Sequence, residues 1–221
     1  MEVMKTKFTF FAILITSGLF SGCVSQSVKA PTEDSVWKYE SKAQITDKVK
    51  SDSYTVAIDV YAFRKQNYRM EITATLGYQV ASVTMNSTSD NSGVRYASYP
   101  HKSFVTGPMS AKVFKPLFKQ DLNPNLLLDF IEDRQPKKYG FLCGRQTELV
   151  TKCTNDEFEL LLERPAKDDT SFIKKFTIDN KTFRMVWLFK NKEFFNGYTD
   201  DMLNRTFVLE KPEGFKQVDI K

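Results

Sequence analysis

The sequence contains few of the residues on which most enzyme and metal sites depend. Its 221 residues include one histidine, three cysteines and two tryptophans. GxSxG, HExxH, P-loop and CxxC motifs are all missing. The single histidine, His101, stands in a turn-like segment where an ordinary solvated role is expected. We therefore expect no catalytic residues, no metal site and no cofactor. A glycosidase-like pair of carboxylates leaves no sequence motif, because the two groups meet only in space, so that alternative stays open.

Strong charge of one sign and long hydrophobic runs are missing too. Lys and Arg number 32 against 27 Asp and Glu, a net charge of +5, which is too small a surplus to indicate a nucleic-acid partner. Charged residues make up 27% and hydrophobic residues 41%, a balance that excludes disorder and coiled coil and favours one globular domain. The uncharged run at 8–20 has 13 residues, about 20 Å of helix, against roughly 30 Å of hydrocarbon in a bilayer.

The N-terminus is typical of an export signal. Lys5 and Lys7 precede the apolar run, and small residues follow it. The next segment resembles the lipobox of bacterial lipoproteins, with Phe20 at a position where Leu is usual; it reads Leu19-Phe20-Ser21-Gly22-Cys23. The resemblance implies a signal peptide at 1–22, lipid attachment at Cys23 and a lipid-anchored protein. A plain signal peptide followed by a chance cysteine is the alternative.

The sequence after Cys23 predicts a tether and then one domain. Residues 24–36 are polar and lack a hydrophobic period, so we expect 23–36 to be an acylated flexible tether and 37–221 to be the folded domain. Val24, rather than Asp, follows the cysteine, which by resemblance to enteric sorting signals favours the outer membrane.

Two further cysteines stand ten residues apart. In an exported protein, Cys143 and Cys153 predict a disulfide first. Two free thiols are the alternative, and a metal site would need ligands that the neighbouring sequence does not offer.

Alternation of apolar and polar residues dominates the domain and predicts a mainly antiparallel sheet. Residues 110–118 and 125–132 keep helical spacing instead, which predicts two short helices between the halves of the sheet. Strands are predicted at 39–45, 54–63, 68–74, 80–84, 94–99, 103–106, 141–147, 157–163, 172–178, 183–189 and 205–209.

One predicted turn carries an apolar residue where water is expected. Thr75-Leu76-Gly77-Tyr78 joins two strongly alternating strands. Leu76 either folds back onto the rim of the sheet or forms an exposed tip that contacts lipid or a partner.

Several stretches together resemble the LolA/LolB family of lipoprotein carriers and outer-membrane receptors. They are 68–81, 94–96, 104–107 with the two helices that follow, and 207–220. The resemblance implies a half-open antiparallel β-barrel with short helices forming a lid over an apolar cavity that binds acyl chains. It also implies that Leu76 is the protruding loop leucine that helps to pass lipoproteins into the membrane. Thr75 stands where the family has proline, and the cysteine pair is not a family feature.

Because alternate strand residues face inward, the apolar set of each strand and one helix residue become candidate lining for this cavity. Plain core packing is the alternative for each, since lining and core share a face. The candidates are Val56, Ile58, Val60, Met70, Ile72, Val80, Phe130, Phe176, Ile178, Val186 and Leu188.

Together these features predict a non-catalytic, monomeric lipoprotein on the periplasmic face of the outer membrane. The resemblance implies that it binds acyl chains and helps to insert lipoproteins, with acylated lipoproteins or lipids and a LolA-like carrier as partners. A binder of another hydrophobic ligand and an envelope scaffold are the alternatives.

Overall fold

The computed structural model describes residues 30–88 and 93–221. The predicted signal peptide at 1–22, Cys23 and the first part of the tether lie outside the described residues. Pro31–Lys221 forms one compact unit.

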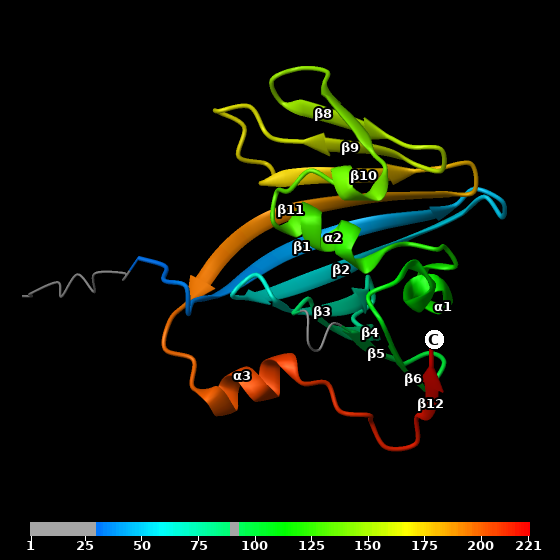
Figure 1. The fold of residues 1–221 in the computed structure, drawn as a ribbon, viewed down its shortest axis with the longest axis vertical. Helices are drawn as coiled ribbons and strands as arrows, with labels where there is room; N and C mark the ends of the chain where they lie inside the picture. Colours follow the sequence, from blue (N-terminus) through cyan, green and yellow to red (C-terminus); the bar gives the residue numbers. More distant parts are fainter. Residues whose placement is uncertain (1–29, 89–92) are drawn as a thin grey trace, which may run out of the picture. The chain divides into compact units, whose positions relative to one another are not determined.

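Twelve strands form a single open sheet that does not close on itself (Figure 1). Neighbouring strands are antiparallel except β12 and β6, which are parallel. The order is β12-β6-β5-β4-β3-β2-β1-β11-β10-β9-β8-β7. The prediction of a mainly β, half-open fold with a few short helices is confirmed. The strands are β1 (Val36–Asp47), β2 (Asp52–Phe63), β3 (Asn67–Ala74), β4 (Gln79–Asn86), β5 (Gly93–Ser98), β6 (Ser103–Gly107), β7 (Leu142–Arg145), β8 (Val150–Thr154), β9 (Glu159–Glu163), β10 (Lys174–Asp179), β11 (Phe183–Phe195) and β12 (Lys216–Asp219).

Short helices connect the two halves of the sheet, as the 3–4 spacing predicts. The connection from β6 to β7 holds η1 (Ala111–Phe114), α1 (Lys115–Phe118), α2 (Pro124–Ile131) and η2 (Lys137–Tyr139). The Asn123 side chain caps α2 by accepting from the backbone N–H of Asn125, at 3.0 Å. No helix among the described residues is long and apolar enough to cross a bilayer.

The predicted strand at 205–209 is wrong, because α3 (Asp200–Phe207) occupies most of that segment. Thr199 caps this helix, with its hydroxyl accepting from the backbone N–H of Met202 at 3.3 Å. Asp201 pairs with Arg205 one turn later at 2.9 Å, and Asp200 adds a second acid to the first turn. These local helix signals outweigh the short alternation at the end of the segment.

The core lies between one face of the sheet, called here the inner face, and α2. Leu126, Leu127, Leu128, Phe130 and Ile131 of α2 are all buried. The inner face contributes the alternate residues of the strands, so the sheet and the helix bury one continuous apolar cluster.

The C-terminal segment crosses the opposite, outer face of the sheet (Figure 1). Phe207 of α3 stacks on Phe63 with ring centroids 6.0 Å apart, and Phe215 packs edge-on against Tyr99 at 5.5 Å. Leu209 is buried between these two contacts. β12 then pairs with β6 and covers that edge of the sheet.

A disulfide joins the two strands at the other edge. Cys143 of β7 and Cys153 of β8 stand directly opposite each other, with Cα atoms 4.0 Å apart. Cys153 is buried against the core and β8 pairs with β9, so the disulfide ties the edge strand β7 to a strand that is already packed on the sheet.

Two fully buried tyrosines provide a test of this core. The Tyr68 hydroxyl donates to Glu132 at 3.1 Å, whereas the Tyr96 hydroxyl has no hydrogen-bond partner in the described part of the chain. We expect Tyr68→Phe to lower the free energy of unfolding by about 1–2 kcal/mol, and Tyr96→Phe to leave it equal or higher. Urea denaturation of both variants measures the difference. Equal losses in the two variants would contradict this assignment.

Tyr96 also makes the free energy of unfolding depend on pH. Burial raises the pKa of Tyr96 to about 12. The folded chain therefore holds this proton more tightly than the unfolded chain does, and the corresponding stability is lost as the pH rises above about 10. Tyr96→Phe removes this part of the alkaline loss, which denaturation at successive pH values measures.

Candidate functional site

The turn between β3 and β4 presents an apolar tip to solvent. Leu76 is 83% exposed and Tyr78 is 70% exposed. Backbone hydrogen bonds close the turn, from Ala74 N to Tyr78 O and from Gly77 N to Ala74 O, both at 2.8 Å. Gly77 has a φ of 84°, which favours glycine. Leu76 therefore does not fold back onto the rim of the sheet.

Most of the predicted lining residues lie together on the inner side of the sheet. Val80 is half-buried beside the irregularity where β3 and β4 shift register, and it packs against the core. The fully buried members are Val56, Ile58, Val60, Met70, Ile72, Phe130, Phe176 and Ile178.

Val186 and Leu188 are corrections to this set, because they face the outer side of the sheet. Alternate residues of β11 are apolar on both faces, so the pattern alone does not choose between them. In the structure Met185, Trp187 and Phe189 are buried in the core instead. The Trp187 indole N–H donates to Ser41 Oγ at 2.8 Å, which fixes this orientation.

The inner face is filled with side chains. Phe130 of α2 stacks on Phe176 of β10, and the other inward-facing residues pack in the same cluster. Of the predicted lining residues, only Phe130 borders any of the three pockets described for this part of the chain. That pocket, between α2 and β8–β9, holds about 10 Å³. An acyl chain would enter the interior only if α2 moved out of it.

A buried lysine holds the end of α2 in place. Lys174 Nζ donates to the carbonyl oxygens of Phe130 and Ile131, both at 2.7 Å, and lies 3.4 Å from a carboxylate oxygen of Asp133. Its side chain is 4% exposed. Nζ also lies 5.1 Å from the centre of the Phe189 ring. Burial lowers the pKa of Lys174, and Asp133 opposes this effect. A cation at the C-terminal end of a helix also complements the helix dipole.

A larger pocket of about 970 Å³ opens beside this end of α2. Its wall combines aromatic rings with both signs of charge, from Trp37, Tyr39, Lys192, Glu132 and Asp133 among others. Lys192 Nζ lies 4.2 Å above the Trp37 ring, so a cation already covers this aromatic surface.

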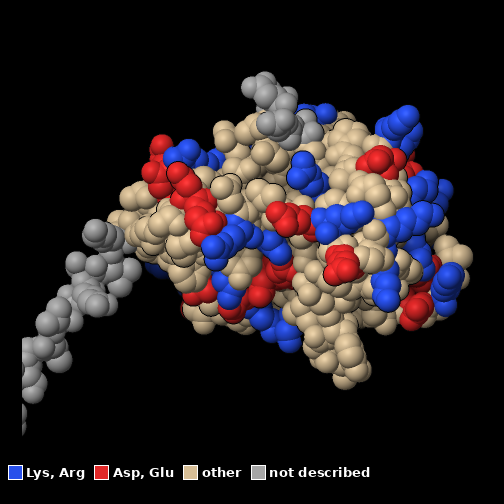
Figure 2. All heavy atoms as spheres, turned by 90° about the horizontal axis from the view of Figure 1, so that it is seen from below, with Lys and Arg blue, Asp and Glu red and all other residues tan. Residues whose placement is uncertain are grey.

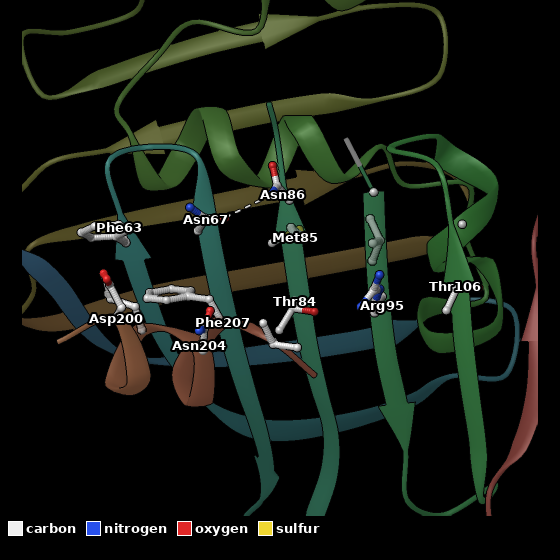
Figure 3. Close-up of a pocket in the computed structure, with 15 residues that line it drawn as sticks. Phe63, Asn67, Thr84, Met85, Asn86, Arg95, Thr106, Asp200, Asn204 and Phe207 are labelled. Atoms are coloured by element: carbon white, nitrogen blue, oxygen red, sulfur yellow. Dashed lines mark hydrogen bonds between the residues drawn. The ribbon is translucent and has the colours of Figure 1, made fainter. Parts of the chain in front are cut away.

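The third pocket, of about 1040 Å³, lies on the outer face between α3 and the strands β2–β6 (Figure 3). Thr84, Arg95 and Thr106 stand side by side on β4, β5 and β6 and form its floor. Asn204 and Phe207 border it from α3. The described residues contain no cluster of His, Cys, Asp and Glu able to hold a metal ion.

Lys174 and the α3 pocket are the features that the sequence did not predict. Lys174 stands in phase with the inward-facing Phe176 and Ile178, and a lysine at such a position is the signal that could have marked it. The α3 pocket depends on a helix placed where a strand was predicted.

Comparison with known proteins yields only distant structural likenesses. The sequence matches no protein-family model and no curated protein. A DUF1329 family protein from Desulfovibrio piger has a TM-score of 0.43 and 9% identity, over 75% of this chain and 88% of that chain. An outer membrane lipoprotein-sorting protein domain from Vibrio parahaemolyticus has a TM-score of 0.41 and 8% identity, over 80% of this chain and 92% of that chain. At TM-scores below 0.5, neither likeness supports a conclusion about function.

The adjacent lysines of β10 test the role of Lys174. Lys174→Met removes a buried donor from the carbonyl groups of Phe130 and Ile131, of which Phe130 O still accepts from the backbone N–H of Asp133 at 3.2 Å. We expect a loss of about 2–4 kcal/mol in the free energy of unfolding. Lys175 lies on the outer face and pairs with Glu163 at 2.6 Å, so Lys175→Met should cost less than about 1 kcal/mol. Chemical denaturation compares the two, and equal losses would contradict a specific role for Lys174.

Proposed function

We propose that this chain is a lipid-anchored envelope protein that binds acyl chains and passes acylated proteins into a membrane through the β3–β4 turn. The observation that carries the proposal is the exposure of Leu76 at the tip of a hydrogen-bonded turn. Transfer of an exposed apolar side chain from water to lipid lowers the free energy. Tyr78, with an apolar ring and a polar hydroxyl, suits the boundary between lipid and water. The resemblance to the LolA/LolB family assigns the same role to this loop.

The interior supplies the acyl-binding part of the proposal. Seven of the predicted lining residues, all on strands, already form one apolar surface, which α2 covers with the eighth, Phe130. Each buried methylene contributes about 0.8 kcal/mol, so an acyl chain with about 15 methylenes brings on the order of 12 kcal/mol. Displacing α2 would expose its five buried apolar side chains, at about 1.5–3 kcal/mol each, and break its bonds to Lys174, so the cost and the gain are of similar size. Acyl chain and helix then compete for the same surface.

The remaining parts of the proposal follow from the N-terminal sequence. A signal peptide at 1–22 directs export, and acylation at Cys23 anchors the chain to the periplasmic face of the outer membrane. A LolA-like carrier delivers the acylated cargo. The transfer needs no covalent step, only a series of increasing affinities for the acyl chains, so the protein acts without a cofactor and as a monomer.

A second candidate function is a scaffold that binds no lipid. The observation that favours it is the filled interior, in which α2 and the inner face of the sheet pack as an ordinary core. In this case the exposed turn contacts a protein partner.

Acyl binding separates the two candidates. The mature chain with Cys23→Ala, purified without detergent, should show bound acyl mass in a native mass spectrum or take up added fatty acid. Lys174→Met should take up fatty acid faster, because α2 is then held less tightly. A bare chain that takes up no fatty acid or lipopeptide would contradict acyl binding and leave the scaffold.

The turn is tested by a charge at its tip. Leu76→Glu should slow the transfer of an acylated lipoprotein to membranes by about tenfold or more, since the transfer free energy of one leucine side chain is lost and a charge must be desolvated. Met202→Glu, at a 46% exposed methionine on α3, is the matched control and should transfer normally. Normal transfer by Leu76→Glu, with unchanged thermal unfolding, would rule out this role for the turn.

A further inference from the structure

Exposed apolar side chains concentrate on two neighbouring turns. Nine large apolar residues are exposed in the described part of the chain, and four of them belong to these turns or their flanks. Val49 and Tyr54 stand at the β1–β2 turn, and Leu76 and Tyr78 stand at the β3–β4 turn. Val49 is 73% exposed, close to the value for Leu76. A single exposed residue needs no explanation, but such a cluster does.

The sheet places the two turns side by side. β2 pairs with both β1 and β3, and Ala74, the last residue of β3, lies opposite Val56 near the start of β2. The Thr75 hydroxyl donates to the backbone carbonyl of Thr55 at 3.0 Å and so ties the second turn to β2. Val49 and Leu76 therefore project from the same end of the sheet.

The β1–β2 turn is held in shape by its own hydrogen bonds. The Asp47 carboxylate accepts from the backbone N–H groups of Val49 and Lys50, at 3.0 and 3.1 Å. Lys48 pairs with Asp179 and donates to the carbonyl oxygen of Asn180 at 2.8 Å, which joins this turn to the next one, between β10 and β11. Val49 is thus presented on a fixed support rather than on a loose loop.

Lysines surround the apolar tips. Lys48 and Lys50 flank Val49, and the adjoining turns carry Lys102 and Lys181. Lys50, Lys102 and Lys181 form no ion pair among the described residues. The acids beside the two turns are Asp47 and Asp52, with Asp179 paired to Lys48. Asp156 and Glu157 stand further along the same end, in the β8–β9 turn. In Figure 2, Lys and Arg side chains are frequent at the right-hand end of the molecule, with Asp and Glu side chains among them.

We propose that the two turns form one contact surface for an anionic phospholipid bilayer. Val49 and Leu76 enter the acyl region, while Tyr78 and the lysines lie at the level of the phosphate groups. This inference rests on the proposed membrane role of Leu76 and adds a second point of insertion and a preference for anionic headgroups. Two apolar tips flanked by lysines match a bilayer surface better than a neutral protein groove, because both kinds of side chain then have their preferred surroundings.

Vesicle binding tests the proposal on the mature chain with Cys23→Ala, so that no acyl anchor contributes. We expect it to sediment with vesicles of phosphatidylcholine and phosphatidylglycerol, and more weakly with phosphatidylcholine alone. Val49→Glu should lower the binding by about fivefold or more, through loss of the transfer free energy of a valine side chain. Lys50→Gln should weaken binding to the mixed vesicles alone, and Met202→Glu should bind like the unchanged chain.

The outcomes separate this inference from the proposed function. If Leu76→Glu loses vesicle binding and Val49→Glu does not, the contact is limited to one turn and the inference is wrong, while the proposed function stands. Equal binding to both vesicle types would overturn the headgroup preference. If the unchanged chain binds neither vesicle while Leu76→Glu still blocks lipoprotein transfer, the turn serves a protein partner. Unchanged thermal unfolding of each variant shows that the fold is intact.

Discussion

Burial of α2 against the inner face of the sheet is the constraint on which the rest of the structure depends. An open sheet of twelve strands has one apolar face, and that face must be covered. Here a helix of only 8 residues covers its centre, and the buried Lys174 ammonium group binds the carbonyl groups at its end. The helix occupies the surface that an acyl chain would need, so stability and ligand binding compete for one set of apolar contacts.

The other surfaces of the sheet are protected by the remaining segments. α3 and the chain that follows it cross the outer face, and β12 covers the edge of β6. At the far edge β7 is only four residues long and is joined to β8 by a disulfide. Short, covered or cross-linked edges limit pairing with other chains. The sheet can therefore be open without exposing a long free edge.

Against this protected background, the apolar tips of the β1–β2 and β3–β4 turns are the exception. Both turns are fixed by hydrogen bonds, so Val49 and Leu76 stay in solvent although their burial would be favourable. The free energy of such a surface falls when it is buried against an apolar partner. The proposed membrane contact would bury the apolar tips of both turns and place the lysines beside them near anionic headgroups.

The sequence by itself determined the strands and the helices wherever one period was clear. Alternation located β2, β3 and β4, and helical spacing after Pro124 located α2, because these patterns report which residues face the core. Turn chemistry around Gly77 likewise located the turn that carries Leu76. Local pattern did not decide the facing of β11, where both alternate sets are apolar and the Trp187–Ser41 bond selects one of them. Nor did it predict α3, whose cap and charge pair outweighed a short alternation. Only the tertiary structure decided that the inward-facing residues pack around α2, and that Lys174 meets the end of that helix. Both depend on contacts between segments more than 40 residues apart, which no local pattern records.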